Sequence, residues 1–204
     1  MDQLLYWVGI AAVAVNAITG VLEAERKAMD LVGAVMVAIA TALGGGTLRD
    51  MLLNREVFWV ANQTYLAAGF SIAVATFFWA RRRKISPQLF LYPDAIGLAL
   101  FTIIGTQGAL QWHAPWLVAS MLGVVTGVFG GVLRDVFCNQ LPLIFLPGEL
   151  YATAAWLGAL LLIGLQELGV DAAWSAWVAM GTIFALRAAA IRFHIRLPTF
   201  SAMA

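Results

Sequence analysis

The stretch LGGGTLRD at residues 43–50 places three consecutive glycines, an arginine and an aspartate inside an otherwise apolar segment. The pattern returns as FGGVLRD at residues 129–135. Both stretches contain GGxLRD, beginning at Gly45 and at Gly130, so the two copies are offset by 85 residues (130 − 45 = 85). The chain therefore contains an internal repeat, and this repeat decides its fold.

Composition identifies a membrane protein. Of the 204 residues, 62% are hydrophobic and 11% are charged, whereas soluble domains carry roughly 25% charged residues. A helix that crosses the hydrocarbon core needs about 20 mostly apolar residues. Seven segments meet this requirement, at 4–22, 29–52, 57–80, 91–112, 115–138, 148–166 and 172–192. We expect an all-α polytopic membrane protein with seven transmembrane helices and no soluble domain.

The spans divide into two repeats within a single membrane domain. Repeat one covers about residues 1–84, repeat two about 86–168, and the seventh helix, about 172–192, stands outside both. Each repeat holds three spans, and because three is odd, the second repeat enters the membrane from the opposite side. The sequence thus predicts inverted repeats related by a pseudo-two-fold axis in the membrane plane.

Basic residues orient the spans. Lys and Arg concentrate in cytoplasmic loops, and one set of loops together with the C-terminal tail holds Arg26, Lys27, Arg81, Arg82, Arg83, Lys84, Arg192 and Arg196. The opposite loops hold only Arg55. We expect the N-terminus outside and the C-terminus in the cytoplasm. The run at 81–84 is either a topology anchor or a binding site for anionic lipid headgroups.

Charge and cysteine content exclude several classes of function. The net charge of +1 favours no nucleic-acid partner, and the single Cys138 excludes an intrachain disulfide or a cysteine-based metal cluster. His113 and His194 lie in loops without the spacing of a catalytic site. The sequence predicts no enzyme, no metal site and no cofactor.

The motif helices each carry one narrow stripe of small and polar residues. At about 100° per residue, the stripe of the second span covers an arc of roughly 80°. Its members are Ala34, Ala38, Thr41, Gly45 and Arg49, and their partners in the fifth span are Ala119, Gly123, Thr126, Gly130 and Arg134. Small residues spaced in this way indicate close helix packing, or they line a polar path.

The arginines favour a polar path, because an arginine near the middle of a membrane helix costs roughly 2.5 to 3.5 kcal/mol. Each glycine inside a helix costs about 1 kcal/mol relative to alanine. Gly44, Gly45 and Gly46 concentrate that weakness in one turn. We expect the helix to bend or open there and to leave carbonyls facing a hydrated waist, as in transporters with broken helices.

The motif charges need partners. Arg49 and Asp50 are sequence neighbours whose side chains point about 100° apart, so we expect them not to pair. Symmetry suggests Asp135 or Asp94 as the partner of Arg49, and Asp50 as the partner of Arg134. Because a cation path must suppress the repulsion of its two arginines, we also expect Asp50 and Asp135 to compensate them locally.

Two further aspartates begin spans. Asp30 precedes the second span and Asp94 begins the fourth, in the related strings DLVG and DAIG. Each is either a helix N-cap or a charge at a pore mouth.

These features resemble one known family. Two GGxLRD helices in inverted three-span repeats, a seventh span, and the strings MDLVGAV and PDAIGLALF are similar to the prokaryotic trimeric intracellular cation (TRIC) channels. The resemblance implies a homotrimer in lipid, with an hourglass pore through each protomer between the second and fifth helices. It also implies conduction of monovalent cations, K⁺ above all and also Na⁺.

The same resemblance assigns site residues. It implies kinks at Gly44, Gly45 and Gly46 and at Gly127, Gly130 and Gly131, with Thr41, Thr126 and the Arg-Asp pairs along the pore. Phe129 replaces the leading glycine of the second copy, which suggests a stiffer second kink. The Lys-Glu-Val string of the animal members is absent, so we expect a prokaryotic cytoplasmic-membrane protein without phosphoinositide binding.

Secondary transporters use the same architecture, so a transporter of a small solute such as glycine is the alternative. A transporter of an amphoteric solute would be expected to carry more polar residues at mid-depth than this chain does. Asn16 and Gln107 are such residues, and each could equally join helices by hydrogen bonds. A purely structural role would leave the two buried arginines without a purpose.

Overall fold

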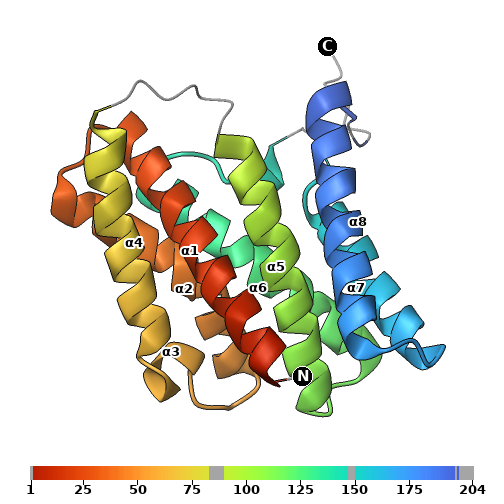
Figure 1. Ribbon diagram of the computed structural model, residues 1–204. Helices are drawn as coiled ribbons and strands as arrows, with labels where there is room; N and C mark the ends of the chain where they lie inside the picture. Colours follow the sequence, from red (N-terminus) through yellow and green to blue (C-terminus); the bar gives the residue numbers. More distant parts are fainter. Residues whose placement is uncertain (1, 83–89, 147–149, 196, 198–204) are drawn as a thin grey trace.

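A computed structural model of the protein describes residues 2–82, 90–146, 150–195 and 197 (Figure 1). This part of the chain is a helical bundle without strands, which confirms the all-α prediction. Its helices are α1 (Asp2–Arg26), α2 (Leu31–Leu52), α3 (Phe58–Ala61), α4 (Thr64–Ala80), α5 (Leu91–Gln111), α6 (Trp116–Phe137), the 3₁₀ turn η2 (Leu143–Phe145), α7 (Ala152–Glu167) and α8 (Ala172–Phe193).

Within the described residues, five helices are long and apolar enough to cross a membrane, namely α1, α2, α5, α6 and α8. The apolar helices α4 and α7 are shorter, with 17 and 16 residues. The predicted span at 57–80 is divided, because α3 ends at Ala61 and Asn62 turns the chain by accepting a hydrogen bond from the Thr64 amide at 3.0 Å. The predicted span at 148–166 begins later, at Ala152.

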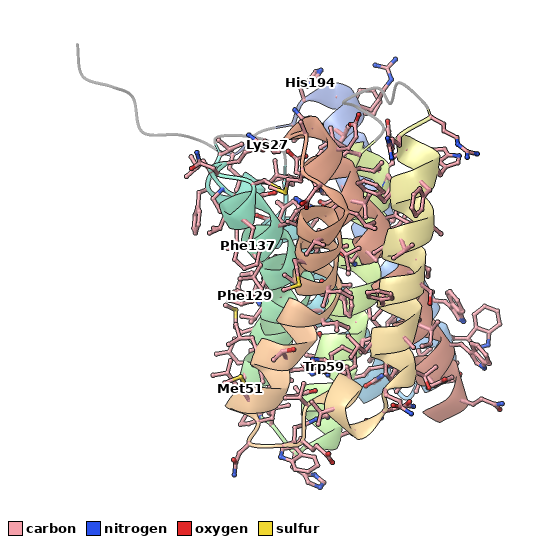
Figure 2. All side chains as sticks on the ribbon, turned by 90° about the vertical axis from the view of Figure 1, so that its left-hand side faces the viewer. Lys27, Met51, Trp59, Phe129, Phe137 and His194 are labelled. Atoms are coloured by element: carbon pink, nitrogen blue, oxygen red, sulfur yellow. The ribbon has the colours of Figure 1, made fainter. Side chains whose placement is uncertain are left out.

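Corresponding helices of the two repeats run in opposite directions. In Figure 1, α1 rises toward the end of the bundle at which α5 begins. In Figure 2, α2 descends to Met51 at the lower end, while α6 rises to Phe137 near the upper end, where Lys27 and His194 also lie. This arrangement is the one expected of inverted repeats.

The turns that follow the helices also repeat. Ala28 and His113, 85 residues apart, have left-handed backbone with φ of 54° and 57°. Asn54 and Asn139, again 85 residues apart, have φ of 50° and 52°. The repeat thus extends from side-chain identity to backbone conformation at both ends of the motif helices.

The two motif helices cross at their glycines. A Cβ atom on Gly45 would collide with the carbonyl of Thr126, and one on Gly130 would collide with the carbonyl of Thr41. The contact is reciprocal, and it has the form of the Cα–H···O approaches found where helices pack closely. Only glycine allows backbones to come so near.

The expected opening at Gly44–Gly46 is not observed. Both α2 and α6 are continuous α-helices through their glycines. The glycines therefore serve close packing, and the helical hydrogen bonds that an opening would break remain intact. Packing against a neighbouring helix outweighs the weak helix propensity of glycine, because propensity is a small term beside tertiary contact.

A second glycine contact flanks the crossing in each repeat. Gly20 of α1 lies against the backbone of Ala38 in α2, and Gly105 of α5 lies against Gly123 and Thr126 in α6. The centre of the bundle is therefore a four-helix core of α1, α2, α6 and α5, in which α1 and α5 also pack against each other (Figure 1). Helix α4 covers the first repeat, and α7 and α8 cover the second (Figure 1).

The outer surface of the bundle is apolar. Large side chains such as Met36, Phe70 and Trp174 are exposed by 63%, 54% and 69%. Apolar surface on this scale marks contact with lipid or with another subunit, as expected for a membrane protein.

The crossing yields a stability prediction. Gly45→Ala and Gly130→Ala each place a methyl group against a carbonyl, and overpacking of this kind typically costs about 1–3 kcal/mol. We expect both variants to unfold at a clearly lower temperature in detergent. Gly181→Ala is the matched control, because Gly181 lies within α8 with nothing near its Cβ position. Equal melting temperatures for all three variants would contradict the packing role.

Candidate pore and its charge clusters

The charges of the first motif form a three-residue cluster at the end of α2. Arg49 Nε lies 2.7 Å and Arg55 Nε 3.0 Å from the same carboxylate oxygen, Oδ1 of Asp50. The other oxygen, Oδ2, accepts a hydrogen bond from the Phe58 amide at 2.9 Å. Asp50 is fully buried, and it fixes the chain between α2 and α3 by these three contacts.

The charges of the second motif form a related cluster at the end of α6. Arg134 Nε lies 2.8 Å from Oδ1 of Asp135, and Arg134 Nη1 lies 2.6 Å from Oδ1 of Asp94 on α5. Oδ2 of Asp135 accepts a hydrogen bond from the Leu143 amide at 3.0 Å. Arg134 is fully buried, with its guanidinium 4.4 Å from the centre of the Phe90 ring.

The predicted pairing is therefore wrong in part. Arg49 pairs with its sequence neighbour Asp50, because the long arginine side chain reaches around the helix where the 100° geometry alone would separate them. Asp94 pairs with Arg134 of its own repeat rather than with Arg49. The expectation that Asp50 and Asp135 compensate the arginines locally is confirmed.

The threonines lie at the helix crossing and bond within their own helices. Thr41 Oγ1 donates to the Val37 carbonyl and Thr126 Oγ1 to the Leu122 carbonyl, each at 2.6 Å. Both residues are buried. In the conformation described, their hydroxyls are satisfied locally rather than turned toward an open path.

The other motif glycines also meet neighbours. A Cβ on Gly44 would strike Leu133, one on Gly46 would strike Phe58, and one on Gly127 would strike Thr102. A Cβ on Gly131 would come within 3.1 Å of the Tyr151 hydroxyl. Close packing thus holds at every glycine that the resemblance assigns to the kinks.

Two cavities lie at opposite ends of the first repeat. The Arg49 cavity, of about 350 Å³, lies between α1, α2, α4 and α5, and its lining includes Tyr6, Gly9, Arg49, Arg55, Tyr65 and Gly108. The Glu25 cavity, of about 530 Å³, lies at the ends of α1 and α4, and its lining includes Glu25, Met29, Phe77, Arg81 and Arg82. The rest of the basic run, Arg83 and Lys84, falls outside the described residues.

The remaining polar residues predicted for the site do not share one environment. Asp30 is an exposed N-cap that accepts from the Gly33 amide at 2.7 Å, whereas Asp94 is buried in the second cluster. Asn16 donates to the carbonyl of Ala12 in its own helix. Gln107 is buried, and within the described residues its amide has no hydrogen-bond partner. Neither amide joins two helices by a hydrogen bond here.

Sequence reasoning missed a buried carboxylate beside the second cluster. Glu23 accepts from Gln140 Nε2 at 2.6 Å and pairs with Arg26 at 3.0 Å. It also missed the role of Arg55 as a partner of Asp50. A signal was present, because Arg55 and Gln140 are separated by the repeat offset of 85. Nowhere in the described part of the chain do three His, Cys, Asp or Glu side chains gather as a metal site.

Comparison with known proteins identifies the family. The family model described as "Glycine transporter" matches residues 6–81 and 91–167, one match to each repeat. The UPF0126 inner membrane protein YadS of Escherichia coli is 39% identical over 202 residues, covering 98% of this chain and 97% of its own. The UPF0126 membrane protein YvgT of Bacillus subtilis is 32% identical over 201 residues, with coverage of 98% and 96%.

Solved structures agree. The TRIC trimeric intracellular cation channel orthologue from Rhodobacter sphaeroides superposes with a TM-score of 0.89 at 36% identity, over 94% of this chain and 98% of its own. The chain belongs to the prokaryotic TRIC family. A TRIC channel from C. elegans shares the fold alone, with a TM-score of 0.61 at 14% identity over 92% of this chain and 91% of its own. The bacterial relatives place this TRIC protein in a bacterial membrane.

The second cluster yields a prediction on buried charge. Removal of one partner from a buried ion pair commonly costs about 3–5 kcal/mol, because the other charge is left uncompensated. We expect Arg134→Met to lower the unfolding temperature in detergent strongly, because it leaves both Asp94 and Asp135 without their cation. Asp94→Asn should lower it less, because Arg134 keeps its pair with Asp135. The double variant should lose less than the sum of the two, since it strands fewer charges.

Asp30→Asn is the matched control, because this carboxylate is exposed and asparagine is also a good N-cap. Strictly additive losses, or a loss for Asp30→Asn as large as that for Asp94→Asn, would argue against a structural ion-pair cluster.

Proposed function

We propose that the protein is a channel for monovalent cations, with potassium as the main permeant ion. The observation that carries this proposal is the crossing of two antiparallel motif helices, each of which ends in an arginine compensated by a carboxylate of its own repeat. The similarity to structures of TRIC cation channels at 36% and 30% identity supports it.

In this proposal the pore runs through each protomer between α2 and α6. The Arg49 cavity forms its outer mouth, with Gly46 and Arg49 in the lining. Conduction requires the crossing at Gly45 and Gly130 to widen. Widening exposes few unpaired polar groups, because Thr41 and Thr126 keep their hydroxyls bonded within their own helices. No cofactor is needed beyond the permeant ions, K⁺ and Na⁺, and no enzymatic activity is proposed.

The assembly follows from the same family. The Rhodobacter sphaeroides relative is described as trimeric, and we infer a homotrimer surrounded by lipid in the cytoplasmic membrane. We further propose that seven helices cross the membrane, namely the five long ones and the shorter α4 and α7. The end of the bundle with Lys27, Arg81 and Arg82 faces the cytoplasm, which places the N-terminus outside.

A secondary transporter of a small solute is the second candidate. The family model carries the name of a glycine transporter, and inverted repeats are common in transporters. The two mechanisms differ in how the crossing moves: a channel widens it around a continuous path, whereas a transporter rocks one repeat against the other.

Electrical recording tests the proposed function. In a planar bilayer with a potassium gradient, we expect the purified protein to give discrete current steps that reverse near the potassium equilibrium potential. A silent bilayer, together with gradient-driven glycine uptake into liposomes from the same preparation, would replace the channel by the transporter. Empty liposomes, and liposomes with the heat-unfolded protein, are the controls.

Cysteine labelling tests the orientation. We expect a membrane-impermeant maleimide to label Glu56→Cys on intact cells, and Arg82→Cys only after the membrane is opened, because both positions are exposed at opposite ends of the bundle. The reverse pattern would invert the topology.

The native Cys138 provides a low background for this experiment. Its thiol is buried, with 1% of the residue exposed. Labelling of the unsubstituted protein should therefore be slow and should become fast on unfolding.

A further inference from the structure

The repeat offset reveals a difference in charge between the two halves. Asp94, whose carboxylate binds Arg134, corresponds to Gly9 in the first repeat (94 − 85 = 9). Glu23, the buried carboxylate beside the second cluster, corresponds to Gly108 (23 + 85 = 108). Both carboxylates that accompany the motif at one end of the bundle are thus replaced by glycine at the other.

A third difference between the repeats adds a positive charge to the first cluster. Gln140, which binds Glu23, corresponds to Arg55 (140 − 85 = 55), and Arg55 binds Asp50. The first cluster therefore holds two guanidinium groups and one carboxylate. The nearest further acid in the sequence, Glu56, is exposed and does not line the cavity.

Gly108 leaves space beside the surplus charge, whereas the ring of Tyr65 occupies the position of a side chain on Gly9, at 3.0 Å from its Cβ site. Gly9 and Gly108 both line the Arg49 cavity. A Cβ on Gly108 would lie 3.8 Å from Nη1 of Arg49 and 3.8 Å from Nη1 of Arg55. The two guanidinium groups therefore converge on the point where the other repeat would place an acidic side chain.

Because both arginines are largely buried, their surplus positive charge is costly in free energy. Arg49 is buried with 4% of its side chain exposed, and Arg55 keeps only 25% exposed. Burial lowers the pKa of Arg55; Asp50 opposes this shift, and Arg49 adds to it. Among the side chains that the structure describes, a single carboxylate is shared by the two guanidinium groups, which leaves one positive charge there without a local counterion.

We propose that the Arg49 cavity binds a small organic monocarboxylate, whose carboxylate takes the place of the missing acidic side chain between Arg49 and Arg55. Guanidinium groups recognise planar carboxylates by charge-assisted hydrogen bonds. The short apolar body of the ligand lies against Phe101 and Ile104, which also line the cavity.

The size of the cavity favours this ligand over a halide. Its volume of about 350 Å³ is roughly ten times the share of one water molecule in the liquid, so a bare halide would leave most of it to solvent. A carboxylate with a few carbon atoms contacts both the charged end and the apolar wall of the cavity, which a bare halide cannot do. The proposal does not depend on ion conduction, because binding is measured without any current.

The test is a binding titration of sodium propionate on the purified full-length protein in an uncharged detergent at low chloride, followed by saturation-transfer NMR. We expect saturable binding in the millimolar range, as befits a ligand of so few atoms. Arg55→Gln installs the residue of the other repeat and should weaken binding by about tenfold or more, the effect of one lost charge-assisted hydrogen bond. Arg55→Lys should bind within a few fold of the native protein.

Gly108→Asp is the second variant, because it supplies the missing carboxylate from the protein itself. It should fold, melt at a higher temperature than the native protein, and abolish propionate binding. Gly108→Ala is the control for the loss of glycine, because it adds a Cβ atom without a charge, and it should keep the native affinity. If propionate does not bind, or if Arg55→Gln and Gly108→Asp bind it as the native protein does, the proposal is overturned. Chloride that binds in an Arg55-dependent way without propionate binding would also overturn the organic ligand.

Discussion

The approach of two helix backbones at Gly45 and Gly130 is the constraint on which the rest of the structure depends. Each glycine faces a carbonyl of the opposite helix, and no side chain fits between them. The contact sets the position of α2 relative to α6, and Gly20 and Gly105 then set α1 and α5 by the same device. Arg49 and Arg134 follow the crossing glycines by four residues, about 6 Å along each helix. The geometry of the crossing therefore places one charged cluster on each side of it.

Buried charge is the second constraint, and it explains why the clusters are compact. An arginine inside a membrane bundle must find its counterions within reach, since the cost of a buried unpaired charge is several kcal/mol. Each motif provides one carboxylate next in sequence, and a backbone amide eight residues further on binds that carboxylate from its other side. The same design serves both ends of the molecule. Only the additional charges differ: a second carboxylate accompanies Arg134, and a second guanidinium accompanies Arg49.

The sequence predicts the repeat, the inversion and the helical class, because these follow from motif spacing, span count and hydropathy. It does not predict whether Gly44, Gly45 and Gly46 open the helix or pack it, since helix propensity favours opening while tertiary contact, which is invisible in one sequence, favours packing. Helix-wheel geometry also separates Arg49 from Asp50, because it treats side chains as short vectors and omits the reach of an arginine. The substitution of Asp94 and Glu23 by Gly9 and Gly108 was readable from the offset, but only a structure shows that both glycines line the cavity that holds Arg49 and Arg55.

The two repeats thus have the same backbone conformation but different charges. This difference bears on how such a protein works. Packed interiors tend to have discrete arrangements rather than continuous ones, so a crossing built from four residues in reciprocal contact favours a closed state and a separated one. The internal hydrogen bonds of Thr41 and Thr126 mean that separation breaks close contacts without stranding hydroxyl groups. The balance between the closed and the separated state then depends on the charges of the two clusters, because these differ between the repeats. Under the proposed function, a net positive cluster at one end and a carboxylate-rich cluster at the other would respond in opposite directions to ions and to membrane potential, so the two repeats would act differently in spite of their shared backbone conformation.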